Sequence, residues 1–215
     1  MIILDGSMGN ELLKRTSKPS SGLWSAQFLI DSPNLVKEVH QAYVDVGAQV
    51  ITTNTYSTIP SYLQKENKTH LMKDLIRKAG AIAREVADAN NQEILVAGSL
   101  PPLDESYRPD LVPNEKDSIP IYQELIDELN PFVDIFLCET VSSIAETSNI
   151  LKALKNNATQ DKKIWLSWTL LEDKSGRVRS KETIEDAFQL AENSNPDAYP
   201  FNCTDPIAIT EGIKK

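Results

Sequence analysis

The sequence predicts an α/β fold in which parallel strands alternate with helices. Short apolar runs recur at intervals typical of strand–helix units, and stretches with helical spacing of apolar residues lie between them. Such an alternation places helices outside a parallel sheet. An open, doubly wound sheet and an eight-unit barrel both satisfy this pattern. The six expected strands cover residues 2–4, 50–53, 94–97, 133–137, 164–168 and 198–203.

The composition is typical of one globular domain. The chain has 215 residues, of which 40% are hydrophobic and 25% are charged, so it can bury a sizeable core. No linker, repeat or low-complexity segment divides it. We therefore expect a single domain over residues 1–215.

Charge and cysteine content argue against several classes of protein. A formal net charge of -9 disfavours nucleic acid or an anionic membrane as a partner. No apolar run approaches the roughly 20 residues that a membrane helix needs, and the N-terminus does not resemble a signal peptide. Two cysteines are too few for a disulfide framework, and two histidines argue against a histidine-built metal site. These features predict a cytoplasmic protein with reduced thiols.

Two segments near the N-terminus each have two interpretations. Residues 5–9 follow the first strand and contain two glycines, which allow either an anion-binding nest of amides or a plain strand-to-helix turn. Residues 16–32 look irregular and carry Trp24 and Phe28. These aromatic side chains either line a pocket or pack against outer helices.

Apolar spacing predicts five helices between the strands. The first begins at the Ser32-Pro33 pair and ends at Gly47, with His40 beside its inner face as a packing residue. The expected inner positions of the five helices are Leu35, Val39, Ala42 and Val46; Leu71, Leu75, Ala79, Ile82 and Val86; Tyr122, Leu125, Ile126 and Leu129; Ile150, Leu151 and Leu154; and Ile184, Ala187, Phe188 and Ala191.

The sequence also predicts two helix caps and two irregular loops. Ser143 and Glu146 predict a capping box. Thr204 or Asp205 caps a last helix, for which Pro206 suits the first position. The proline-containing residues 101–114 should be irregular, and the charged loop at residues 172–179 is assigned no chemistry.

Polar side chains follow three expected strands at the point where each strand ends. Residues 54–57 either orient a small substrate or cap a turn. Glu139 follows an apolar strand, where a charge is costly unless it is paired or used, so we favour a functional role over a surface one. Cys203 ends the last strand, where a thiolate could bind a metal or attack a substrate, or where a buried thiol could simply pack.

Taken together, these strand ends resemble the homocysteine S-methyltransferase family. Each matching piece is short, but the pieces occur in family order along nearly the whole chain. They cover residues 4–12, 23–26, 33–40, 52–56, 97–100, 138–140 and 201–206.

The resemblance implies a (β/α)8 TIM-type barrel with zinc at its mouth, of which about six units are present here and the last two are lacking. Cys203 matches a zinc ligand, and Asp5 and Glu139 match carboxylates that hold the ammonium group of homocysteine. Amides around Gly6 and Ser7 would meet its carboxylate. Further pocket positions implied by the resemblance are Trp24, Ser25, Asn54, Tyr56 and Asn202.

The implied reaction is transfer of a methyl group from an onium donor to homocysteine, giving methionine. The donor would be S-methylmethionine or S-adenosylmethionine. A free thiol has a pKa near 8.5, whereas a zinc-bound thiol is deprotonated and can attack the methyl group. The implied partners are therefore homocysteine and a methyl donor, with zinc as the cofactor.

The sequence departs from the family pattern in three places. The family's second and third zinc ligands are a cysteine pair, which we expect beyond Lys215. Cys138 stands where the family usually has phenylalanine, and we interpret it as a packing residue and not a ligand. Residues 98–102 lack a glycine that commonly precedes the proline, which affects the expected shape of that loop.

A second hypothesis is a truncated, non-catalytic homologue that binds a small molecule or a partner. An incomplete barrel exposes two sheet edges and apolar surface, so such a chain should aggregate, form a dimer or have these edges covered in another way. Zinc content separates the two hypotheses, because a single thiolate holds zinc weakly.

Overall fold

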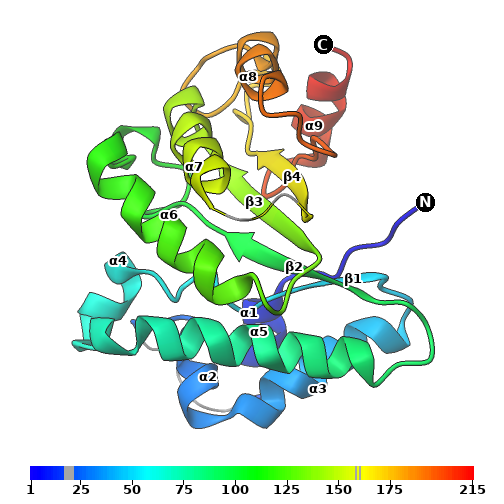
Figure 1. Cartoon of the computed structure of the whole chain (residues 1–215). Helices are drawn as coiled ribbons and strands as arrows, with labels where there is room; N and C mark the ends of the chain where they lie inside the picture. The colour runs from blue at the N-terminus through cyan, green and yellow to red at the C-terminus, as the bar shows by residue number, and fades with distance from the viewer. Residues whose placement is uncertain (17–21, 158, 160) are drawn as a thin grey trace. The chain divides into compact units, whose positions relative to one another are not determined.

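The computed structural model describes residues 1–16, 22–157, 159 and 161–215. Its strands are β1 (Val50–Thr52), β2 (Leu95–Leu100), β3 (Ile135–Val141) and β4 (Lys163–Trp168). They form one sheet in this order, and β1 pairs with β2 in parallel. Helices separate successive strands along the chain (Figure 1). The predicted α/β fold with a parallel sheet is confirmed, whereas the closed barrel stays a prediction.

The helices are α1 (Met8–Lys14), α2 (Ala26–Asp31), α3 (Pro33–Asp45), α4 (Pro60–Leu63), α5 (Met72–Asp88), α6 (Glu115–Leu129), α7 (Ile144–Asn156), α8 (Ile184–Glu192) and α9 (Pro206–Ile213). Helices α3, α5, α6, α7 and α8 lie close to where apolar spacing predicted them, and α9 begins at the predicted cap. Short 3-10 turns cover Gln64–Glu66, Thr69–Leu71 and Pro109–Leu111. Residues 101–114 are otherwise irregular, as expected.

The chain divides into two compact units, which we describe separately. Unit 1 comprises Met1–Ser99 and Leu125–Phe136, and unit 2 comprises Leu100–Glu124 and Leu137–Lys215. Both β2 and β3 therefore begin in unit 1 and end in unit 2.

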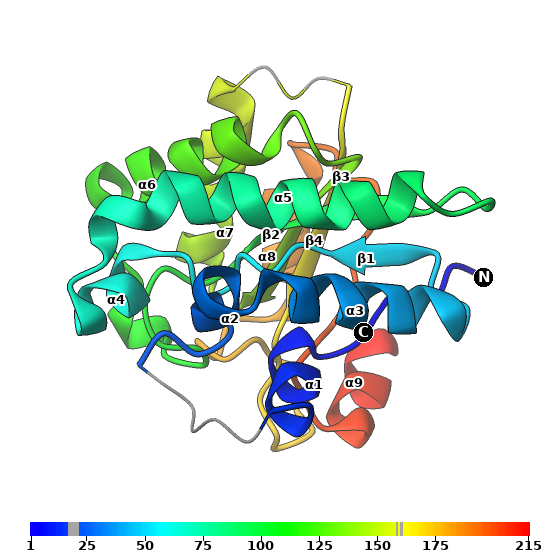
Figure 2. The same ribbon diagram turned by 90° about the horizontal axis from the view of Figure 1, so that it is seen from below.

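In unit 1, helices pack beside the first strands. Leu4 makes a single parallel bridge to Val50, so the expected strand at residues 2–4 is reduced to one bridged residue. Helices α3 and α5 run side by side (Figure 2). In α5 the predicted inner residues from Leu75 to Val86 are buried, because their spacing matches the helical repeat.

The buried face of α3 differs from the expected one. Val36, Val39 and His40 are buried, whereas Val46 is 81% exposed. The helix packs against α1, α2 and α5, so its buried side is set by several neighbours and not by one stripe. Val46 lies at the C-cap, beyond the last packed turn. His40 is confirmed as a packing residue.

Helix α2 lies in the segment that we expected to be irregular, which corrects that expectation. Ala26, Phe28 and Leu29 are buried in it. A helix of 6 residues is too short to show a clear apolar period in the sequence. Residues 17–21 of the same segment lie outside the described residues.

In unit 2, β3 continues past the expected end at Leu137 and includes Cys138, Glu139 and Thr140. Ser143 caps α7 as predicted, because its side chain accepts a hydrogen bond from the Glu146 amide. The Glu146 carboxylate does not close a capping box. It accepts from the amide and hydroxyl of Ser142 at 2.7 and 2.8 Å.

The expected buried strand at residues 198–203 is instead a half-buried segment with two single bridges to β4. These bridges join Trp165 to Ala198 and Trp168 to Phe201, both in parallel. Stacking supplies much of its packing, since the Tyr199 ring lies 5.8 Å from the Trp168 ring. Asp205 then caps α9, accepting from the Ile207 amide at 2.8 Å.

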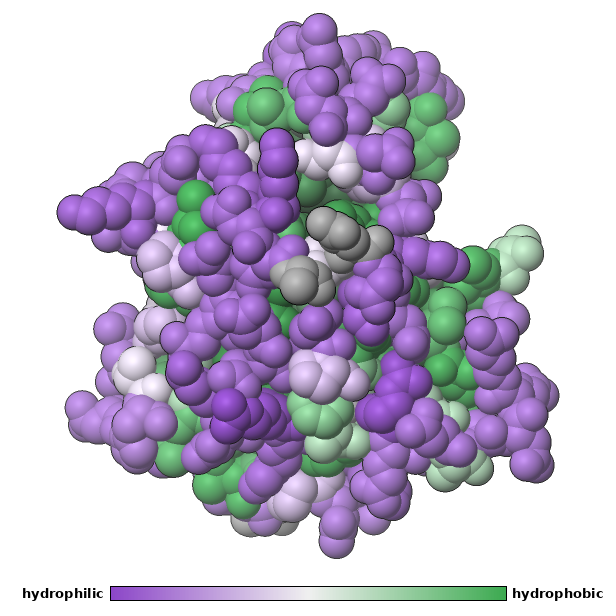
Figure 3. Space-filling view, viewed as in Figure 1, coloured by the Kyte–Doolittle hydropathy of each residue, from purple (hydrophilic) through white to green (hydrophobic). Residues whose placement is uncertain are grey.

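Hydrophilic residues predominate on the face shown in Figure 3, where hydrophobic areas are scattered between them. This agrees with the net charge of -9. Within the described residues, every helix is too short or too polar to cross a lipid bilayer.

A strained lysine in unit 2 leads to a prediction about stability. Lys181 has a φ of 74°, a left-handed conformation that costs a side-chain-bearing residue about 1–2 kcal/mol. Lys181→Gly should relieve this strain. Glycine loses more backbone entropy on folding than lysine does, so the net stabilisation of the fold should be about 0.5–1 kcal/mol. Urea denaturation measures this change. Lys155→Gly, in the last turn of α7, is the matched control and should destabilise by about 1 kcal/mol. Equal losses for both variants would contradict the prediction.

Candidate functional site

Asp5 lies at the end of the first bridged segment and is held by β1. Its amide donates to the Val50 carbonyl at 2.9 Å. Its carboxylate accepts from the amide and the hydroxyl of Thr52, at 2.7 and 2.8 Å. These three bonds fix the direction of a half-buried carboxylate before any ligand arrives.

The Gly6–Ser7 turn is both a helix start and a close backbone approach. The Ser7 hydroxyl caps α1 by accepting from the Asn10 amide, which is the plain-turn interpretation of this segment. A Cβ on Gly6 would lie 2.9 Å from the Tyr43 hydroxyl oxygen, so a larger residue would displace that ring. Tyr43 in turn donates to the Ser7 carbonyl at 3.4 Å.

Ser25 and Asn54 form a buried polar cluster with Ser57. The Asn54 amide nitrogen donates to the Ser25 carbonyl at 3.0 Å, and the Ser25 and Ser57 hydroxyl oxygens are 3.0 Å apart. Ser25 is 3% exposed and Asn54 is 2% exposed, so both hold the loop after β1 in place. Tyr56, in the same loop, is half-buried.

Trp24 directly precedes Ser25 in the sequence, and its ring packs against Gly9 of α1. Its indole nitrogen would be 2.5 Å from a Cβ on Gly9, so glycine is required there for the ring to lie where it does. Trp24 has a φ of 49°, and 38% of it is exposed. An exposed aromatic side chain held in this way is available to contact a ligand.

In unit 2, β3 carries two neighbouring residues with opposite surroundings. Cys138 is buried, and burial raises the pKa of its thiol to about 12, so it stays protonated. This agrees with its interpretation as a packing residue. Glu139 is half-buried on the same strand.

Cys203 is an exposed thiol that accepts hydrogen bonds from two side chains. The Asn202 amide nitrogen lies 3.4 Å from its sulfur, and the Thr140 hydroxyl oxygen lies 3.7 Å from it. Asn202 is itself fixed, because its side-chain oxygen accepts from the Thr140 amide at 2.9 Å and from the Ser167 hydroxyl at 2.8 Å. These contacts fix the direction of the Cys203 sulfur.

Backbone strain gathers at this sulfur. Cys203 has a φ of 51°, Thr140 a φ of 59° and Tyr107 a φ of 66°. Left-handed conformations are rare for β-branched and bulky residues, and strained residues of this kind concentrate at ligand sites.

Tyr107 is a residue of this site that the sequence analysis missed. Burial, followed by the nearby Cys203 and a hydrogen bond to it, raises the pKa of Tyr107 to about 12. The Arg179 guanidinium lies 4.7 Å from the centre of the Tyr107 ring. Neither residue carries a sequence signal, because both lie in loops without apolar periodicity. Thr140 could have been singled out, since it directly follows Glu139.

The structure therefore gathers the predicted residues into two groups, one within each unit. Asp5, Gly6 and Ser7 lie around the start of α1, and Ser25 bonds to Asn54 nearby in the same unit. Asn202 and Cys203 meet the end of β3 in unit 2.

The residues present do not make a complete metal site. Among residues 1–16, 22–157, 159 and 161–215, no three His, Cys, Asp or Glu side chains are grouped so that they could hold a metal ion. A tetrahedral zinc site takes three or four protein ligands. Cys203, as an exposed thiol held by the Asn202 and Thr140 side chains, fits one position of such a site.

Comparison with known proteins identifies the family. The family model described as homocysteine S-methyltransferase matches residues 2–215. The chain belongs to the homocysteine S-methyltransferase family. It is thus a member of an enzyme family, as its strand-end residues predicted.

Individual relatives agree with this assignment. Homocysteine S-methyltransferase YbgG of Bacillus subtilis is 27% identical over 238 residues, covering 100% of this chain and 74% of the relative. Homocysteine S-methyltransferase of Escherichia coli is 29% identical over 184 residues, covering 79% of this chain and 59% of the relative. The chain thus spans about three quarters of one relative's length and is matched over less than two thirds of the other's.

Solved structures of the family share the fold. The metallated form of homocysteine methyltransferase MmuM from Escherichia coli has a TM-score of 0.88 and is 28% identical, covering 99% of this chain and 78% of that one. Its oxidized form has a TM-score of 0.89 at 27% identity, covering 100% and 77%.

Proposed function

We propose that this protein transfers a methyl group from S-methylmethionine or S-adenosylmethionine to the thiol of homocysteine, giving methionine. The observation that carries the proposal is the Cys203 thiol, which is exposed, strained and hydrogen-bonded by Asn202 and Thr140. It occurs in a chain of the homocysteine S-methyltransferase family.

In the proposed reaction one bond forms while one breaks. The homocysteine thiol first loses its proton. Its sulfur then forms a bond to the methyl carbon of the onium donor, while the bond from that carbon to the donor sulfur breaks. The bonding electron pair stays on the donor sulfur, which becomes a neutral thioether. No oxidant or reductant is consumed.

The proposal gives zinc one place on this chain. When bound, zinc lowers the pKa of a coordinated thiol so that it is deprotonated at neutral pH. Cys203 would hold one of its positions, and the other two protein ligands are expected beyond Lys215. Donors from Asn202 and Thr140 would fix the direction of the Cys203 sulfur.

The other predicted residues would bind the amino-acid part of homocysteine. Asp5 and Glu139 would pair with its ammonium group, and the amides of Gly6 and Ser7 would meet its carboxylate. The remaining pocket positions are Trp24, Ser25, Asn54, Tyr56 and Asn202. Asp5 suits this role because its bonds to Thr52 orient the carboxylate in advance.

Two broader expectations belong to the same proposal. We propose that the protein works in the cytoplasm, where both thiols stay reduced. We also propose that a second copy of the chain covers exposed apolar surface.

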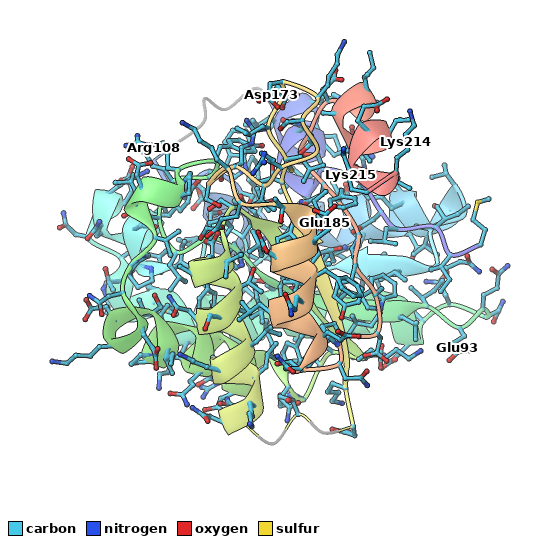
Figure 4. All side chains as sticks on the ribbon, turned by 90° about the horizontal axis from the view of Figure 1, so that it is seen from above. Glu93, Arg108, Asp173, Glu185, Lys214 and Lys215 are labelled. Carbon is cyan, nitrogen blue, oxygen red and sulfur yellow. The ribbon has the colours of Figure 1, made fainter. Side chains whose placement is uncertain are left out.

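Glu139→Ala tests the proposal at a residue that would bind homocysteine. Loss of a charged hydrogen bond costs about 1.5–3 kcal/mol, so the dissociation constant should rise by about 10- to 100-fold. Calorimetric titration with homocysteine measures binding, and methyl transfer from a labelled donor measures turnover. Glu185→Ala is the control, because Glu185 is an exposed acid in the first turn of α8 (Figure 4). Unchanged affinity in Glu139→Ala would contradict the assigned role.

A further inference from the structure

The segment from Glu172 to Glu182 contains the charged loop at residues 172–179, for which no chemistry was predicted, and it folds beside the turn that carries Cys203. We call residues 202–205 the Cys203 turn. The segment is fixed by antiparallel bridges that join Leu170 to Val178 and Arg177 to Thr183. It also lies against α9, because a Cβ on Gly176 would be 3.4 Å from the Gly212 Cα. Figure 4 labels Asp173 of this segment and Lys214 and Lys215, which follow α9.

Arg179 is the most connected side chain of this segment. Its Nη2 lies 2.8 Å from a Glu172 carboxylate oxygen, and its Nε donates to the Thr169 hydroxyl at 3.3 Å. Its guanidinium also covers the Tyr107 ring at 4.7 Å. The Arg179 side chain is only 18% exposed, so solvent screens these contacts less than those of a surface ion pair.

Each of these three contacts continues to the Cys203 turn. Thr169 donates its hydroxyl to the Cys203 carbonyl at 3.2 Å. The second oxygen of Glu172 accepts from the Asp205 amide at 3.1 Å. Tyr107 is hydrogen-bonded to the Cys203 side chain. Three separate routes therefore join one guanidinium to the Cys203 turn, two of them at Cys203 and one at Asp205.

We infer that Arg179 is a positioning residue that fixes the direction of the Cys203 side chain. A planar guanidinium can stack on a ring and bond at its edge simultaneously, which an ammonium group cannot do. A residue with a left-handed backbone conformation, such as Cys203, persists only where neighbouring residues hold it in place. Arg179 contacts Thr169, Glu172 and Tyr107, which in turn contact the Cys203 turn. The inference rests on the proposed function only in taking Cys203 as a zinc ligand.

The first test measures amide hydrogen exchange by NMR in the full chain. Arg179→Gln removes the partner of Glu172, so the Asp205 amide should exchange about fivefold faster, while the amide of Ile209 in α9 keeps its protection. Arg177→Gln is the matched control, because Arg177 lies in the same segment and contacts the Lys181 carbonyl instead. Equal acceleration in both variants, or none in Arg179→Gln, would overturn the inference.

The second test uses the Cys203 thiol as a local probe. Iodoacetate and iodoacetamide attack the same thiolate, so the ratio of their rates at one pH cancels its degree of ionisation and reports nearby charge. Arg179→Gln should lower this ratio by about threefold, whereas Arg179→Lys and Arg177→Gln should preserve it. Buried Cys138 should stay unlabelled in every variant and thus reports any global opening. An unchanged ratio in Arg179→Gln would count against Arg179 as a neighbour of Cys203.

Glu172→Gln keeps the inference testable if Arg179→Gln does not fold. Glu172 is exposed, so this variant should fold, and it should accelerate exchange at Asp205 as Arg179→Gln does. In methyl transfer, Arg179→Gln should lower kcat and leave the KM for homocysteine unchanged, with partial rescue in Arg179→Lys. Normal kcat in Arg179→Gln overturns the inference and leaves the proposed function standing. Absence of turnover in a chain extended through the ligands expected beyond Lys215 removes the proposed function, while exchange and labelling still decide the role of Arg179.

Discussion

In a chain extended through the ligands expected beyond Lys215, Cys203→Ala is expected to remove methyl transfer to homocysteine almost completely. Without the metal that Cys203 would help to hold, only about 3% of the homocysteine thiol is ionised at pH 7, given a thiol pKa near 8.5. Misplacement of the homocysteine sulfur should lower the rate of methyl transfer by a further factor of about 100. Together these effects predict a fall in kcat/KM of about 3000-fold, measured with a labelled donor. Bound zinc, measured by mass spectrometry, should fall with it.

Cys138→Ala is the matched control for this experiment. The Cys138 thiol is buried and has a pKa of about 12, so it stays neutral and cannot act as a ligand at pH 7. Its loss should cost about 1 kcal/mol of stability through a small cavity and leave turnover per folded molecule unchanged. Methyl transfer that survives Cys203→Ala would eliminate the metal mechanism. Transfer that disappears equally in both variants would show that folding, and not the thiol, was lost.

The free energy of unfolding is expected to fall by about 3 kcal/mol between pH 7.5 and pH 4 through His40 alone. His40 is fully buried, and among the described residues neither ring nitrogen has a hydrogen-bond partner. Burial lowers the pKa of His40 from 6.5 to about 4, because the charged imidazolium is excluded from the core. Between these values the unfolded chain binds the extra proton, so stability is complete above pH 6.5 and is lost as pH falls toward 4.

A comparison of variants isolates this effect from other titrating groups. Burial raises the pKa of Glu146, for example, which destabilises the fold as pH rises and thus acts in the opposite direction. Urea denaturation should therefore be measured from pH 4 to pH 8 for the unaltered protein and for His40→Met. Methionine is similar in size to histidine but does not titrate. The difference in unfolding free energy between the two should change by about 3 kcal/mol across this range. A difference that does not depend on pH would show that the His40 ring is hydrated or hydrogen-bonded in solution.

Local patterns in the sequence were enough for most helices and for several caps. Helix α5 shows why, because 17 residues carry several helical turns of apolar side chains and their period is plain. Asp205 and Pro206 were readable as the start of α9 because a cap depends on residues that are adjacent in the chain. The predicted pocket and metal-binding residues were singled out in the same way, by their places at strand ends and by family resemblance.

Long-range packing decided the features that local patterns could not. Helix α2 is too short to show a period, and the buried side of α3 depends on three neighbouring helices. Residues 198–203 have the apolar character of a strand, yet they make only two single bridges to β4.

The sequence by itself determined the family, the alternation of strands and helices, and Cys203 as the thiol of interest, because each depends on short local motifs. Only the tertiary structure placed Tyr107, Thr169 and Arg179 around that thiol. The physical reason is that these residues come from loops distant in sequence, and their hydrogen bonds exist only once the chain has brought the loops together. No local pattern encodes such a meeting.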